Sequence, residues 1–145
     1  MQLSTKARYA ARAMMELAIS YGQGPTLLKN IAQKQNISEK YLEQLMAPLR
    51  ASGLIYTMRG NKGGYVLGRD PNQITLYEII SIVEGSLAPV PCVDKVEMCQ
   101  RWERCATRQV WVKLKERLAE ELQAINLADL AQSQEQIYKD LGLEQ

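Results

Sequence analysis

The chain has 145 residues, of which 46% are apolar and 23% are charged, and this composition is typical of one soluble domain. No apolar run approaches the roughly 18 residues that cross a bilayer, and the N-terminus leads into no signal-peptide core, so we expect a cytoplasmic protein without membrane contact. Residues 1–70 hold ten basic and four acidic side chains, a net charge of +6, whereas residues 71–145 hold eight and twelve, a net charge of −4. A basic first half indicates polyanion binding, although two solvated surfaces without a partner would carry the same charges.

Apolar residues at helical spacing predict three helices in the first fifty residues. The first covers Thr5–Tyr21 and is ended by a Gly/Pro-rich turn, and a shorter helix follows over Leu27–Gln35. A tight turn then places Ser38 as the N-cap of a third helix over Glu39–Arg50. Because Pro48 has no N–H to donate, we expect it to kink or end this helix just before its own position.

The periodicity changes to that of strands after Gly53. Leu54–Arg59 and Tyr65–Leu67 are predicted to be strands, joined by a turn over Gly60–Gly64. The order helix, helix, tight turn, helix and two-stranded ribbon is that of a winged helix-turn-helix. In such a fold the N-terminal residues of the third helix reach base edges in the major groove of duplex DNA.

The second half is predicted to be mainly helical around one loop. A helix over Leu76–Val83, with Thr75 as its N-cap, precedes a loop over Gly85–Glu103, and a long helix follows over Arg104–Ile125. We expect one more turn over Leu127–Leu130 and a weakly ordered tail after Ser133. An apolar stripe follows the long helix: Trp111, Leu114, Leu118, Leu122 and Ile125. This stripe either covers a second copy of the chain or packs within one copy.

Candidate DNA-contacting residues lie on the third helix and in the hairpin turn: Ser38, Lys40, Tyr41, Glu43, Gln44, Arg59, Gly60 and Lys62. Glu43 can accept a hydrogen bond from cytosine N4, or it is simply a solvated glutamate. Arg59 can reach a narrow minor groove, or it is a surface arginine without a DNA contact.

All three cysteines lie within fourteen residues, at Cys92, Cys99 and Cys105, and the chain contains no histidine. Convergent thiolates hold soft metals or sense oxidants, and an odd number of cysteines disfavours a disulfide framework. We place Cys105 in the first turn of the long helix and expect the response of the protein to begin at this cluster.

Three motifs in order resemble one family: LSTKxRYA at 3–10, ISxxYLEQL at 37–45 and RGxxGGYxL at 59–67. They are similar to the Rrf-two (Rrf2) family of bacterial transcription regulators. The resemblance implies a homodimer that binds a pseudo-palindromic DNA operator, with a long C-terminal helix crossing the partner subunit. We therefore predict a mainly α fold with a winged helix-turn-helix DNA-binding domain at 1–84. A cysteine-bearing sensor segment follows at 85–105, and a dimerisation helix with a tail at 106–145.

The resemblance also implies an iron–sulfur cluster, of 2Fe–2S or 4Fe–4S type, on Cys92, Cys99 and Cys105. IscR-like members add a histidine where this chain has Arg108, and NsrR-like members add a partner-subunit aspartate where it has Arg8. Neither arginine can be expected to ligate iron, so the fourth ligand must come from elsewhere. Candidates are Asp94, Glu97 and Glu103, with Gln100, water or a small thiol as alternatives.

Two other function classes compete with this prediction. An enzyme is disfavoured, because the chain lacks histidine for acid–base catalysis and lacks a phosphate-binding loop with its lysine. A CymR-like regulator without a cluster, gated by thiol oxidation or by a partner enzyme, is the main alternative. Loss of the DNA response in a Cys92→Ala protein would separate the cluster from a partner-gated switch.

Overall fold

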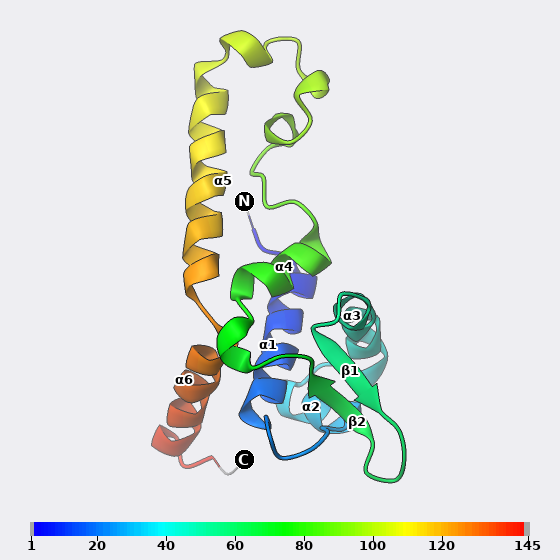
Figure 1. The fold of residues 1–145 in the computed structure, drawn as a ribbon. Helices are drawn as coiled ribbons and strands as arrows, with labels where there is room; N and C mark the ends of the chain where they lie inside the picture. Colours follow the sequence, from blue (N-terminus) through cyan, green and yellow to red (C-terminus); the bar gives the residue numbers. More distant parts are fainter. Residues whose placement is uncertain (1, 144–145) are drawn as a thin grey trace.

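The order of the elements is that of the predicted winged helix-turn-helix followed by a long helical arm (Figure 1). The computed structural model describes residues 2–143. Over this range the helices are α1 (Thr5–Ile19), α2 (Leu28–Gln35), α3 (Glu39–Ala51), α4 (Leu76–Glu84), α5 (Ala106–Ala124) and α6 (Leu127–Asp140). The strands are β1 (Ile55–Met58) and β2 (Gly64–Leu67). The predicted mainly α class is confirmed.

Side-chain caps fix the starts of three helices. The hydroxyls of Ser4, Ser38 and Thr75 accept hydrogen bonds of 3.2 Å from the backbone N–H three residues later, at α1, α3 and α4 respectively. Each cap satisfies an N–H that has no partner within its own helix. The helix starts predicted at Ser38 and Thr75 therefore lie where the sequence places them.

Pro48 does not end α3, so the expectation of a helix end before the proline is wrong, while the predicted range to Arg50 is within one residue of the observed one. The helix continues three residues further, to Ala51. Leu45 and Leu49 are buried on either side of the proline, whereas Pro48 itself is exposed. The backbone group left without a partner therefore faces solvent, and the burial on the opposite face holds the turn together.

The two strands form an antiparallel hairpin in which Ile55 pairs with Leu67 and Met58 with Gly64. Its return strand is fastened to the α1–α2 connection: the Thr26 N–H donates to the Tyr65 carbonyl at 2.9 Å, and the Tyr65 N–H donates to the Thr26 carbonyl at 2.8 Å. The hairpin is thus the wing of the fold, and backbone hydrogen bonds hold its return strand to the α1–α2 connection.

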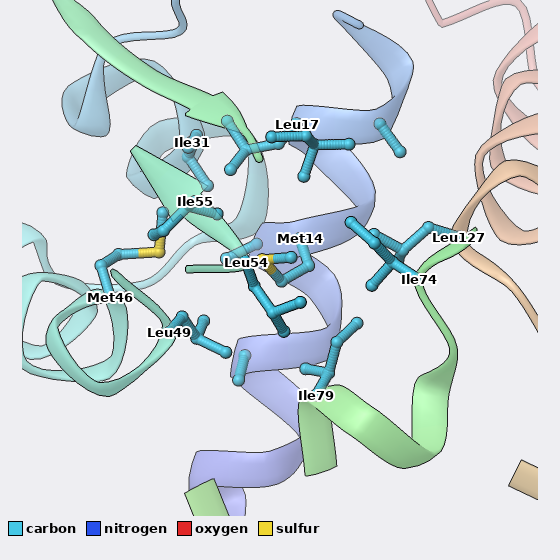
Figure 2. Close-up of a cluster of buried hydrophobic side chains, with 14 of the residues drawn as sticks. Met14, Leu17, Ile31, Met46, Leu49, Leu54, Ile55, Ile74, Ile79 and Leu127 are labelled. Carbon is cyan, nitrogen blue, oxygen red and sulfur yellow. The ribbon is translucent and has the colours of Figure 1, made fainter. Parts of the chain in front are cut away.

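Helix α1 lies at the centre of the domain and contacts α2, α3, α4, α6 and β2. Figure 2 shows Met14 of α1 in the middle of the cluster, with Leu49 of α3 and Ile79 of α4 below it and Leu127 of α6 at the right, beside Ile74. The core residues Met14, Leu49, Ile79 and Leu127 are fully buried. One apolar core therefore joins α2 and α3 to α6.

The expectation of a weakly ordered tail after Ser133 is wrong up to Asp140, because α6 continues to that residue and packs along α1; residues 144–145 lie outside the described range. The Asn126 side chain caps its start by accepting from the Asp129 N–H at 2.9 Å. Leu127 and Ala131 are buried in the main core. Apart from the exposed Ile137, only polar residues separate these core positions from Tyr138, so the amphipathic helical pattern is weak in the sequence although α6 packs along α1 in the fold.

Helix α5 and the cysteine segment form an arm that projects away from the winged domain (Figure 1). The helix begins at Ala106, so Cys105 is its N-cap rather than part of its first turn, and that placement is corrected. Ile125 is also outside the helix, where an extended backbone lets its carbonyl accept from the Leu76 N–H at 2.9 Å. Within the range 2–143, no helix is long and apolar enough to span a membrane.

Candidate nucleic-acid interface and cysteine segment

The N-terminal turns of α3 present polar side chains to solvent while the opposite face joins the core. Lys40, Glu43 and Gln44 are exposed, whereas Leu42 and Met46 of the same helix are buried. This division follows from the helical period. The structure therefore places three of the predicted DNA-contacting side chains on one free surface.

Tyr41 differs from these neighbours because it is only half exposed. Its ring packs edge-on against Tyr9 of α1, with ring centroids 6.0 Å apart and an interplanar angle of 77°. Its backbone N–H is bound by the Ser38 cap. Ser38 and Tyr41 thus hold the first turn of α3 in place, beside the exposed polar side chains of that helix.

The wing carries the second group of predicted residues at its tip. Arg59, Gly60 and Lys62 are all exposed, and the turn is closed by the Gly63 N–H donating to the Gly60 carbonyl at 3.0 Å. Figure 1 shows the hairpin and α3 on the same side of the domain, away from α5 and α6. The fold thus brings both groups of predicted residues onto one side of the protein.

The cations on this side are free for an anionic partner. Lys40, Arg59 and Lys62 form no ion pair with any carboxylate in the part of the chain that the structure describes. By contrast, Arg69 just beyond the wing is engaged by Glu78 of α4. Unpaired lysine and arginine side chains flanking an exposed helix N-terminus suit contact with DNA phosphates.

The cysteine segment consists of three single turns of 3₁₀ helix: η2 (Pro91–Val93), η3 (Val96–Met98) and η4 (Trp102–Arg104). Cys92 lies within η2, Cys99 follows η3, and Cys105 separates η4 from α5. All three thiols are free and half-buried. The segment therefore presents its cysteines from three separate short turns.

Arg108 fastens the two ends of this segment to each other. Its Nε donates to the Cys92 carbonyl at 2.9 Å and its second amino group to the Val93 carbonyl at 3.4 Å. Its guanidinium also lies 5.7 Å from the centroid of the Trp102 ring, in cation–π contact. In the sequence, Arg108 is notable only because it stands where IscR-like members have a histidine ligand. No local sequence pattern predicts its contacts with Cys92, Val93 and Trp102.

Asp94, one of the candidate fourth ligands, is already engaged. Its carboxylate accepts from Lys115 of α5 and from the Ser86 hydroxyl. The Lys115 ammonium, followed by the Ser86 hydroxyl, holds the pKa of Asp94 below its usual range. The other two candidates, Glu97 and Glu103, are exposed and form no hydrogen bond or ion pair within residues 2–143.

Cys105 has the most activating surroundings of the three thiols. Its sulfur lies 3.2 Å from the Thr107 hydroxyl at the start of α5. That contact, together with the backbone N–H of Arg108 and the charge of Arg101, lowers the pKa of Cys105. A thiol at the N-terminus of a 19-residue helix is thereby favoured as thiolate.

The thiols of Cys92, Cys99 and Cys105 are chemically suited to iron, because cysteine thiolates are the usual ligands of iron–sulfur clusters. The described geometry is not a preformed site, since no group of three or more His, Cys, Asp or Glu side chains within residues 2–143 is placed to hold a metal ion. Cluster binding would require the three short turns to bring their thiols together.

A capped helix with exposed polar residues beside a basic wing defines a winged-helix DNA-binding protein. A profile of the Rrf2 family, described as an iron-dependent transcriptional regulator, matches residues 3–133. The chain therefore belongs to the Rrf2 family of transcriptional regulators, and the resemblance read from its motifs is confirmed.

Two branches of the family are similar to this chain. The HTH-type transcriptional regulator CymR of Bacillus subtilis (strain 168) is 45% identical over 131 residues, which is 90% of either chain. The HTH-type transcriptional regulator IscR of Xenorhabdus nematophila is 43% identical over 135 residues, 93% of this chain and 82% of the relative.

Solved structures from the same two branches share the fold. CymR (YrzC), the global cysteine regulator of B. subtilis, superposes with a TM-score of 0.78 at 43% identity, covering 92% of this chain and 98% of the other. T. potens IscR gives a TM-score of 0.78 at 40% identity, covering 94% and 90%.

Proposed function

We propose that the chain is a homodimeric transcription regulator that binds a pseudo-palindromic DNA duplex through α3 and the wing. The observation that carries this proposal is that the exposed cations Lys40, Arg59 and Lys62 are unpaired and lie on the same side of the protein as the polar side chains of α3. We call this side the reading side. In this arrangement Glu43 and Gln44 face base edges. Lys40, Arg59 and Lys62 contact the phosphate backbone or the minor groove.

The apolar face of α5 supports the dimer. In one copy only Leu122 of this helix is buried, while Val110 is 55% and Leu114 39% exposed. A helix that leaves so much apolar surface uncovered is stabilised by a partner, and a second copy provides the two-fold symmetry of a pseudo-palindromic site. We retain the division into a DNA-binding domain at 1–84, a sensor segment at 85–105 and a dimerisation region at 106–145.

We propose further that an iron–sulfur cluster on Cys92, Cys99 and Cys105 modulates operator binding. The description of the family as iron-dependent and the three clustered thiols support this cofactor. Glu97 and Glu103 are better candidates for a fourth ligand than Asp94, because only Asp94 would first have to leave Lys115. The cytoplasm, where thiols remain reduced, is the compartment in which such a site would assemble.

Thiol oxidation is the second candidate, and the surroundings of Cys105 favour it. A thiolate stabilised by the start of α5 reacts with oxidants without any metal. Gating by a partner protein, as an alternative to either chemistry, would leave DNA binding independent of the cysteines.

An absorption spectrum with iron and acid-labile sulfide analysis, on protein purified without oxygen, separates these candidates. Coloured protein with matching iron and sulfide, both lost in Cys92→Ala, supports the cluster. Colourless protein after anaerobic reconstitution excludes it. In that case, loss of duplex binding after peroxide treatment of wild type but not of Cys105→Ala supports the thiol switch.

The DNA-binding part of the proposal is tested with duplexes selected by the wild-type protein from a random pool. Lys62→Ala should weaken binding to selected and scrambled duplexes alike, because phosphate contacts carry no sequence information. Gln44→Ala should weaken binding to the selected duplex only. Unchanged affinities in both variants would contradict the assigned reading surface.

A further inference from the structure

The most deeply buried charged side chain in the winged domain is Glu16 on α1. Because its carboxylate is buried, it is not available for a direct contact with DNA. Glu16 is 2% exposed. A buried carboxylate is destabilising unless it is paired and hydrogen-bonded. Its partners come from two other helices: the Gln35 amide and the Lys34 ammonium of α2, the latter at 3.6 Å, and the Tyr138 hydroxyl of α6.

One side of this network holds the end of α2. Gln35, its last residue, is buried, and Arg12 donates both to its carbonyl and, at 2.7 Å, to its side-chain oxygen. The carbonyl at a helix C-terminus has no partner within the helix, so Arg12 supplies one. Directly afterwards Asn36 adopts a left-handed conformation with φ of 51°, which turns the chain towards the Ser38 cap. The network thus fixes the residue from which the helix-turn-helix turn departs.

The same arginine also connects to the first turn of α3. The Arg12 guanidinium lies 5.0 Å from the centroid of the Tyr9 ring, and that ring packs edge-on against Tyr41. Tyr9, Arg12 and Glu16 lie at positions i, i+3 and i+7, which is one face of α1. This face therefore touches both the turn before α3 and the start of α3.

The other side of the network reaches the C-terminal helix. The Tyr138 hydroxyl donates to the Glu16 carboxylate at 3.1 Å, across 122 positions of sequence. Burial, followed by the negative charge of Glu16, raises the pKa of Tyr138. The hydroxyl therefore keeps its proton and donates this hydrogen bond at neutral pH.

We propose that Glu16 is a positioning residue for DNA recognition, through which Tyr138 of α6 and Gln35 of α2 set the placement of the turn before α3. The inference rests on the proposed role of α3 in DNA reading. It assigns to α6, the last helix of the chain, a part in sequence discrimination although α6 lies away from the reading side (Figure 1). A misplaced α3 loses base contacts, whereas contacts to phosphates tolerate small shifts.

Tyr138→Phe tests this with the removal of one hydroxyl. Its matched control is Tyr77→Phe, because Tyr77 is also half-buried and its hydroxyl makes no hydrogen bond anywhere in residues 2–143. Affinities are measured for the duplex selected by wild type and for a scrambled duplex of equal length. We expect Tyr138→Phe to bind the selected duplex about tenfold more weakly, as fits the loss of one hydrogen bond to a charged group, with the scrambled duplex unaffected. Tyr77→Phe should match wild type on both.

A purely structural role predicts a different pattern, since loss of folded protein lowers both affinities by the same factor. Equal losses on the two duplexes, or no loss on either, overturn the inference. Glu16→Gln provides a second test. If Tyr138 acts through Glu16, Tyr138→Phe should cause no further loss of discrimination in the Glu16→Gln protein, and additive losses would contradict the coupling. Failure of wild type itself to discriminate the duplexes refutes the DNA-reading role and this inference with it.

Discussion

The substitution Gly64→Ala adds one methyl group at the first residue of β2 and tests how the wing is held to the domain. A Cβ at this position would lie 2.4 Å from the carbonyl oxygen of Thr26 and 2.6 Å from its carbonyl carbon. Both atoms are backbone, so no flexible side chain can move aside. In addition, φ at Gly64 is +149°, a value that residues with a side chain rarely adopt.

The cost follows from these two effects. Relief of the collision requires the strand to move from Thr26, which breaks the two backbone hydrogen bonds between Thr26 and Tyr65. Each contributes about 1 kcal/mol net, and the strained backbone adds about 1 kcal/mol. Gly64→Ala should therefore lower the free energy of unfolding by about 3 kcal/mol, a large share of the roughly 5–15 kcal/mol typical of a domain.

Gly60→Ala is the matched control. Gly60 also has a positive φ, of +111°, but an added Cβ there meets nothing within 4 Å. It should cost only the strain of about 1 kcal/mol. Urea unfolding measures the free energy of unfolding of both variants. The protein concentration is kept fixed, because the stability of the proposed dimer depends on it. Equal midpoints for the two variants would refute the argument that backbone contact at Thr26 holds the wing.

Three further predictions concern the cap, an ion pair and a thiol. Ser38→Ala should lower the free energy of unfolding by about 1 kcal/mol, since the α3 cap is lost; a urea midpoint equal to that of wild type would contradict this. Because the pKa of Asp94 is lowered in the folded protein, its pairing with Lys115 stabilises above the unfolded carboxyl pKa and is lost as pH falls through the folded one. Asp94→Asn should then be less stable than wild type by up to about 1 kcal/mol at pH 7, and the difference should decline as pH falls below about 4. A stability difference that does not change with pH would contradict this. Iodoacetamide at neutral pH should modify Cys105 before the other two cysteines, and Thr107→Val should slow that reaction, as followed by peptide mass spectrometry. A rate unchanged by Thr107→Val would show that the hydroxyl does not activate the thiol.

The sequence alone was sufficient where structure depends on neighbours a few residues apart. The helix starts at Ser38 and Thr75 follow from capping side chains that act over three residues, and the hairpin follows from alternation around a glycine-rich turn. The family was also evident from short motifs, each contained within nine positions. The iron–sulfur cofactor and the roles of individual DNA-contacting residues stay predictions.

The sequence was insufficient where distant residues decide the outcome. Pro48 is tolerated inside α3 because the buried face holds the helix while the proline faces solvent. The tail after Ser133 is helical because α6 packs along α1, with Leu127 and Ala131 in the core and Tyr138 bonded to Glu16. In both cases the burial of apolar surface outweighs a weak local preference.

The same division applies to the functional residues. The spacing of the cysteines and the exposed face of α3 could be read along the chain, because each is a property of consecutive residues. The pairing of Asp94 with Lys115 joins residues 21 positions apart, and the contact of Glu16 with Tyr138 joins residues 122 apart. Only the packed fold brings such groups within hydrogen-bonding distance. Sequence therefore determined the class of protein and its local elements, whereas tertiary structure decided which polar groups hold α3 and the cysteine segment in place.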